Sequence, residues 1–165
     1  GNSGPANIRV IRSDQFGLPV WSKTYGSPAN NEREKMITRL ADGNFLILSS
    51  QKISSKFFIH LFKIDPNGNI LWERTFGEAN QSLFGECITE AEQSNLVIAA
   101  WTGTEYQGDK MVFMKLDPQG NLLLKKFYNP PIATWGPDFE FWPTTNPKSL
   151  AYAVAVLADG SYLFS

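Results

Sequence analysis

The feature that most constrains the fold is a short pattern that occurs three times at a nearly constant interval. It starts at an aspartate, has a glycine three residues later, and is clearest in "IDPNGNILWERTFG", from Ile64 to Gly77. The aligned positions are Asp14, Asp65 and Asp117, then Gly17, Gly68 and Gly120, with Trp21 and Trp72 in the first two copies and Leu124 in the third. The aspartates are 51 and 52 residues apart, so the copies are in step.

A second marker repeats with the same interval. "LADGNFLIL" begins at Leu40, a degraded partner "EQSNLVIA" begins at Glu92, and a close one, "LADGSYLF", begins at Leu157. A period slightly above 50 residues, built from short apolar runs and turn signals, is typical of β-propellers rather than of helical solenoids.

Each repeat contains four candidate strands separated by turn signals. In the complete copy they are Lys35 to Leu40, Asn44 to Ser50, Phe57 to Ile64 and Asn69 to Thr75. Asp42 and Gly43 suit the positive φ angles of a type I′ turn, and Pro66 and Gly68 favour a turn between the last two strands. We therefore predict an all-β chain whose units are four-stranded antiparallel meanders, the blades of a β-propeller.

Composition excludes several classes of protein. The net charge is −1, which does not suit a nucleic-acid binder that neutralises phosphates. The longest apolar run, Leu150 to Ala158, has nine residues, whereas a membrane-spanning helix needs about 20. The single cysteine, Cys87, excludes an internal disulfide framework, and its place in an alternating strand favours a small buried apolar group.

The repeat also brings a family into view. The pattern D-x-x-G-x-[ILP]-[LV]-W-x-[KR]-T-[FY]-G, with "xADGxxLI" upstream, resembles the β-propeller repeats of secreted and surface-exposed bacterial proteins, and it covers nearly the whole chain except Asn129 to Lys148. The resemblance implies that the repeated Trp and Gly residues, such as Trp21, Trp72, Gly26 and Gly77, serve packing rather than catalysis. It also implies a location outside the cell, on the outer-membrane exterior or in the periplasm, in a secreted protein or a lipoprotein.

The two ends of the chain correspond to complementary halves of one repeat. The start matches the second half, and "LADGSYLFS" at the end matches the first half. We divide the single propeller domain, 1–165, into units of about 1–31, 32–79, 80–128 and 149–165. These make only three blades, with one split between the termini, whereas propellers have roughly four to eight. We expect a piece of a longer propeller; the alternative is that copies assemble into a larger ring.

One segment, 129–148, interrupts the period with an insertion rich in aromatic residues and proline. Insertions in repeat proteins fall on loops of one face, often the binding face. Its large side chains, Trp135, Phe139, Phe141 and Trp142, either cover the end of the propeller or form a contact surface for a protein partner or for sugar rings.

Catalysis finds little support in the sequence. The only histidine, His60, shares its strand position with Arg9 and Val112, and we expect a strand residue that faces solvent or a neighbour rather than a general base. We expect no catalytic residue, no metal and no cofactor. The leading hypothesis is a non-catalytic module that binds a protein partner, such as an outer-membrane transport or secretion complex, or a glycan. The alternative is an enzyme similar to quinone-dependent dehydrogenases, although no quinone or calcium ligands are evident.

Overall fold

The described residues form β-strands, many of them joined by short turns. The computed structural model describes residues 7–26, 31–78, 80–104, 107–129 and 153–164. Its strands are β1 (Ile8–Ser13), β2 (Pro19–Tyr25), β3 (Asn31–Arg39), β4 (Phe45–Ile53), β5 (Lys56–Ile64), β6 (Ile70–Phe76), β7 (Ser82–Glu90), β8 (Leu96–Thr104), β9 (Gln107–Leu116), β10 (Leu122–Tyr128), β11 (Val154–Val156) and β12 (Tyr162–Phe164). One 3-10 turn, Glu92–Ser94, lies between β7 and β8.

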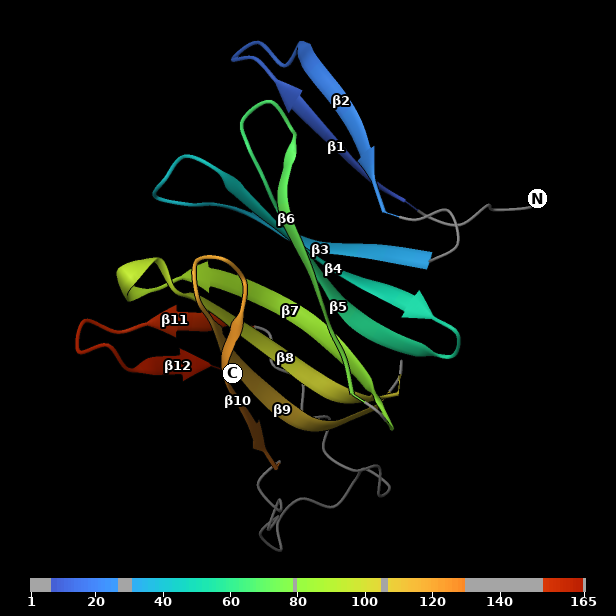
Figure 1. Cartoon of the computed structure of the whole chain (residues 1–165), viewed down its shortest axis with the longest axis vertical. Helices are drawn as coiled ribbons and strands as arrows, with labels where there is room; N and C mark the ends of the chain where they lie inside the picture. The colour runs from blue at the N-terminus through green and yellow to red at the C-terminus, as the bar shows by residue number, and fades with distance from the viewer. Residues whose placement is uncertain (1–6, 27–30, 79, 105–106, 130–152, 165) are drawn as a thin grey trace, which may run out of the picture.

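The strands form four antiparallel sheets, which follow one another through the molecule (Figure 1). The first sheet is β1–β2, the second is β3–β4–β5–β6, the third is β7–β8–β9–β10, and the fourth is β11–β12. The prediction of an all-β chain with antiparallel sheets is confirmed. In the described ranges there is no helix with the length and apolar character needed to cross a membrane.

The turn at Asp42 and Gly43 differs from the expected type I′ geometry. Gly43 has a φ of +85°, but Asp42 does not have a positive φ. The Leu40 amide donates to the Asn44 carbonyl and the Gly43 amide donates to the Leu40 carbonyl, at 2.9 and 3.0 Å. This three-residue loop needs a left-handed conformation only at its glycine, and it recurs with the same hydrogen bonds at residues 14–18, 65–69, 117–121 and 157–161.

The repeated aspartates organise the turns after β1, β5 and β9. Asp65 Oδ1 accepts hydrogen bonds from the amides of Asn67 and Asn69, both at 2.8 Å. Asp14 and Asp117 accept the corresponding pairs of amides. The pKa of Asp65 is below its ordinary value because Asn69 donates hydrogen bonds to it. The bond from the backbone N–H of Asn69 has the largest effect, and the bond from its side chain comes next. The aspartate is therefore a turn-forming residue, as its side chain satisfies amides that the loop leaves unpaired.

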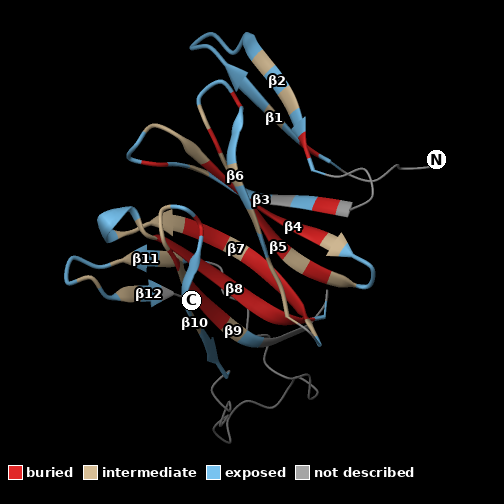
Figure 2. Cartoon of the chain, in the orientation of Figure 1, coloured by how far each residue is buried: buried red, intermediate tan, exposed pale blue. Residues whose placement is uncertain are grey.

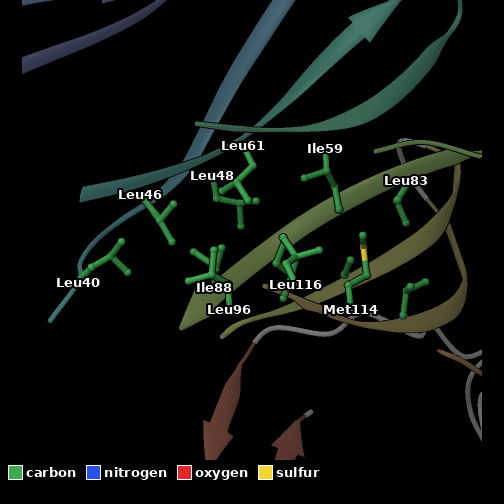
Figure 3. Packing of buried hydrophobic residues seen from close by; sticks show 13 residues of the cluster. Leu40, Leu46, Leu48, Ile59, Leu61, Leu83, Ile88, Leu96, Met114 and Leu116 are labelled. Carbon is green, nitrogen blue, oxygen red and sulfur yellow. The ribbon is translucent and has the colours of Figure 1, made fainter. Parts of the chain in front are cut away.

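The main hydrophobic core lies between the second and third sheets, which pack face to face (Figure 3). Leu46, Leu48 and Leu61 project from the second sheet toward the third. Ile88 and Met114 of the third sheet belong to the same buried cluster. All five are almost completely buried, because each sheet covers one apolar face of the other.

Contacts between successive sheets repeat with the sequence. A Cβ added at Gly68 would lie 3.0 Å from the Trp21 ring, and one added at Gly120 would lie 2.9 Å from the Trp72 ring. The tryptophan of one sheet therefore lies against the turn glycine of the next. A side chain at that glycine would collide with the ring, and its φ of +76° or +79° is one that other residues adopt at a cost.

Candidate binding cleft beside strand β1

A cleft lies beside the first sheet. It has a volume of about 470 Å³ and separates β1 from the start of the second sheet. Its lining includes Val10, Ile11, Arg12, Ile37, Arg39 and Phe45. We call it the β1 cleft.

The cleft is open because the first sheet has two strands where the second and third sheets have four. The shared Asp, Gly and Trp positions identify β1 and β2 as the counterparts of β5 and β6. β5 pairs with β4 along one edge and with β6 along the other, but no described strand pairs with the equivalent edge of β1. The unpaired edge of β1 consequently presents backbone groups that can accept another strand.

Side chains facing the cleft show what is missing. Ile37 of β3 and Ile88 of β7 occupy equivalent positions. Each strand has a shift of register, which ends at Met36 in β3 and at Cys87 in β7, and the isoleucine is the next residue. Ile88 is only 1% exposed because the second sheet covers it, whereas Ile37 is 52% exposed. Figure 2 shows the same contrast: the strands of the first sheet are mostly exposed, and β7, β8 and β9 are mostly buried. The sheet face around Ile37 thus lacks an apolar cover from the part of the chain that the structure describes.

The charges at the β1 cleft have one sign. Among the described residues that line it, the charged side chains are two arginines, Arg12 and Arg39, and there is no carboxylate. The Arg12 Nη1 donates to the Pro66 carbonyl at 2.9 Å, which leaves other donors of its guanidinium for a ligand. The cleft therefore suits an apolar segment that carries a carboxylate.

A buried polar cluster also lies at the contact between the first and second sheets, and none of its residues lines the β1 cleft. Nδ1 of His60 is 3.2 Å from Glu32 Oε2, and Nε2 is 2.8 Å from Glu73 Oε1. His60 and Glu32 are almost fully buried, whereas the Glu73 side chain is about half exposed. A cavity of about 330 Å³ adjoins these three residues, and Tyr25 also lines it.

The cluster favours a charged imidazole. Burial lowers the pKa of His60, but the Glu32 and Glu73 carboxylates outweigh burial and raise the pKa above its ordinary value of 6.5. An imidazolium whose two N–H groups both face carboxylates has no lone pair for proton abstraction. The other carboxylate oxygen of Glu32, Oε1, is buried with no hydrogen-bond partner among the described residues.

Sequence reasoning missed this cluster, although it placed His60 on a strand. The equivalent of Glu32 in the third sheet is Leu83, and the equivalent of His60 is Val112. Both of these are fully buried apolar residues. The replacement of two apolar repeat positions by charged residues was the signal that could have revealed the pair.

The other residues singled out by sequence have clear positions or lie outside the described ranges. Trp135, Phe139, Phe141 and Trp142 belong to the segment that is not described. Cys87 is buried beside Ala99, and burial raises the pKa of its thiol. The described residues contain no group of three or more His, Cys, Asp or Glu side chains arranged to hold a metal ion.

No protein-family model and no curated protein matches this sequence. The assignment of a function therefore depends on the geometry of the chain itself.

Proposed function

We propose that the chain is part of a β-propeller that acts as a non-catalytic interaction module, and that the β1 cleft is its binding site for the strands of a protein partner. The four sheets are the blades, the first and fourth of them being half blades. The observation that carries the proposal is the exposed face around Ile37 next to the free edge of β1.

The contacts between the sheets support a propeller arrangement. The first strands of the second and third sheets are linked by Lys35 Nζ and Glu86 Oε1, which are 3.0 Å apart. The turn after β3 is also linked to β7, because the Ala41 amide donates to Glu90 Oε2 at 2.7 Å. The last strands are linked to the next sheet by Trp21 and Trp72. The first strands of the third and fourth sheets, β7 and β11, are also in contact. Contacts of first strand with first strand are what blades around a common axis require.

The binding mode follows from the open edge. An added strand would pair with the backbone of β1, and its side chains would cover Ile37 and the apolar lining of the cleft. Main-chain hydrogen bonds would supply affinity, and the apolar and arginine side chains would supply specificity. The resemblance to bacterial surface propellers supports a partner in an outer-membrane transport or secretion complex, with the aromatic insertion 129–148 as a second contact for protein or glycan.

The His60 cluster supports a non-catalytic role. Both ring nitrogens are held by carboxylates, so the histidine is a structural cation between the first and second sheets rather than an acid or base in an open site. We therefore favour binding over the quinone-dependent enzyme.

Site-specific photo-crosslinking tests this function. A photoreactive phenylalanine analogue replaces Ile37 in the protein as its own cells produce it, and the crosslinked peptide is sequenced. We expect a protein adduct at Ile37 and none at the control position Leu71, which is equally exposed but lies on β6 away from the cleft. An absence of adducts at Ile37, or equal adducts at both positions, would contradict the proposed site.

A further inference from the structure

The occupant of the β1 cleft can be inferred from the opposite end of the molecule. We propose that the cleft binds the β11–β12 hairpin of a second copy of this chain, so that two chains complete each other's half blades. The inference depends on the proposed function, since it names the partner of the same site.

The β11–β12 hairpin is the structural equivalent of the strands that the first sheet lacks. Its turn begins at Leu157, as that of β3–β4 begins at Leu40, and "LADG" is common to both. The Leu157 amide donates to the Ser161 carbonyl and the Gly160 amide donates to the Leu157 carbonyl, which repeats the hydrogen bonds of the Leu40 turn. The hairpin therefore corresponds to the ends of β3 and β4, whereas β1 and β2 correspond to β5 and β6.

The hairpin already packs on its own third sheet as the first strands of a following blade would. Val154 contacts the cluster of Cys87 and Ala99, and the rings of Tyr162 and Phe113 are 5.0 Å apart. This packing covers one face of the hairpin. Its other face and the outer edge of β12 have no partner among the described strands.

The uncovered face of the hairpin is apolar at the positions where a next sheet should lie. Leu157 is 44% exposed although its equivalent Leu40 is 5% exposed, and Leu163 is 64% exposed although its equivalent Leu46 is fully buried. Leu40 and Leu46 are covered by the third sheet, on the side where Ile88 lies. The matching cover for Leu157 and Leu163 is thus the face around Ile37, the equivalent of Ile88.

Charge favours the same match. In the second sheet Lys63 Nζ lies 2.6 Å from Asp42 Oδ2, which joins β5 to the β3–β4 turn. The equivalent residues are Arg12 in the cleft and Asp159 in the hairpin turn. The hairpin therefore brings a carboxylate to a cleft whose charged lining consists of arginines.

The register of the junction follows from the complete sheet. Phe45 pairs with Ile64 and Leu46 pairs with Lys63 in β4–β5. By equivalence, Tyr162 of one chain pairs with Ser13 of the other, and Leu163 pairs with Arg12. Within one chain the hairpin and β1 lie beyond opposite faces of the two complete sheets, so the chain does not close on itself (Figure 1).

Two copies make a closed assembly whose number of blades is typical of propellers. Each chain contributes two complete sheets and two halves, so a pair would contain six blades, within the roughly four to eight that propellers have. Both junctions are then identical under a two-fold axis, as a symmetric dimer requires. Further sheets of a longer chain are the competing occupant.

Light scattering coupled to size exclusion on the purified 165-residue chain tests the inference. We expect twice the mass of the 18.5 kDa chain. Leu163→Asp should give a folded monomer, whereas the matched control Leu123→Asp, on the exposed outer strand β10, should remain a dimer. Arg12→Glu should dissociate the dimer, and adding Asp159→Arg to it should restore the dimer.

Each outcome decides between the two proposals. A monomeric wild-type chain, or a dimer that Leu163→Asp does not affect, overturns the second-copy inference. If the crosslinked peptide at Ile37 then comes from another protein or from further sheets of a longer chain, the β1 cleft remains a binding site with a different occupant. If no adduct forms at Ile37, the proposed function fails as well. Circular dichroism of each variant separates loss of association from loss of folding.

Discussion

The second and third sheets are built from the same sequence pattern in the same strand order, yet they differ on the face that looks toward the preceding sheet. In the third sheet this face is sealed: Ile88 and Leu83 are buried against four complete strands. In the second sheet the preceding element is a half sheet, and the equivalent face holds the exposed Ile37 and the buried, charged Glu32. An apolar repeat position such as that of Ile37 and Ile88 is therefore buried or exposed according to whether the preceding sheet is complete, and not according to the sequence pattern of its own sheet.

The comparison is sharpest at the polar cluster. The third sheet fills the positions of Glu32 and His60 with Leu83 and Val112, so the fold of a sheet does not need the charged pair. The first prediction therefore concerns the replacement of Glu32 and His60 in the second sheet by the leucine and valine of the third. All four stability predictions use chains that carry Leu163→Asp, so that association does not contribute.

We expect the largest effect from His60→Val alone, about 4 kcal/mol of unfolding free energy, because it leaves the Glu32 carboxylate buried without a cation. The double variant Glu32→Leu/His60→Val should recover most of this loss, since both buried charges are removed together. Urea denaturation measures both. A double variant as unstable as the single one would show that the two sheets are not interchangeable at these positions.

The equivalent isoleucines Ile88 and Ile37 predict a smaller change in the free energy of unfolding. Ile88→Ala should lower the unfolding free energy by about 3 kcal/mol, because it removes a fully buried side chain from the main core. Ile37→Ala, at the equivalent exposed position, should change it by less than about 0.5 kcal/mol. Thermal or urea unfolding of the pair gives the difference directly, and equal losses would mean that Ile37 is covered within one chain.

The turn glycines offer a third comparison. Gly68 and Gly17 both have a positive φ, but an added Cβ meets the Tyr25 hydroxyl at 2.8 Å at Gly68 and nothing within 4 Å at Gly17. Gly17→Ala should cost about 1 kcal/mol from backbone strain. Gly68→Ala should cost more, about 2 kcal/mol, because strain and collision add. Equal costs at the two turns would contradict a close contact between the first and second sheets.

The smallest expected effect is a dependence of stability on pH. The pKa of His60 is raised in the folded chain because Glu32 on β3 and Glu73 on β6 hold its charged form against the opposing effect of burial. The stabilisation is complete below the ordinary histidine pKa of 6.5 and is lost as the pH rises through the higher folded value. Urea titrations across this range should therefore show falling stability with rising pH.

The matched control for this pH effect is Glu32→Leu/His60→Val. Its stability should not fall through the same range, because it has no titrating group at the cluster. The same fall in both chains would assign the pH dependence to other groups.

The sequence predicts local structure well because its signals are local. The repeated Asp and Gly mark the turns, and β5 (Lys56–Ile64) and β6 (Ile70–Phe76) lie within a residue or two of their predicted bounds. The turn type was wrong at Asp42, because a left-handed glycine alone suffices for a three-residue loop. Register shifts such as the one next to Lys35 carry no comparable sequence signal.

The candidate site was harder to predict because it depends on distant contacts. Glu32 and His60 lie on strands separated by β4, so their contact requires the registers of two strand pairs. The openness at Ile37 depends on which strands stand in front of the second sheet. The predicted aromatic site, Trp135, Phe139, Phe141 and Trp142, lies outside the described residues, so it stays a prediction.

The most direct test of the central claim, that β1 accepts the β12 edge of another copy, is an engineered disulfide. One chain carries Arg12→Cys and a second carries Leu163→Cys, and the two are mixed under mild oxidation. Residues paired across antiparallel strands have Cα atoms about 4.5–5.5 Å apart, close enough for a disulfide. The account predicts a covalent heterodimer that forms only in the mixture and joins position 12 to position 163. Mixed chains that stay uncrosslinked, or link equally well when the second cysteine replaces Leu123, would contradict it.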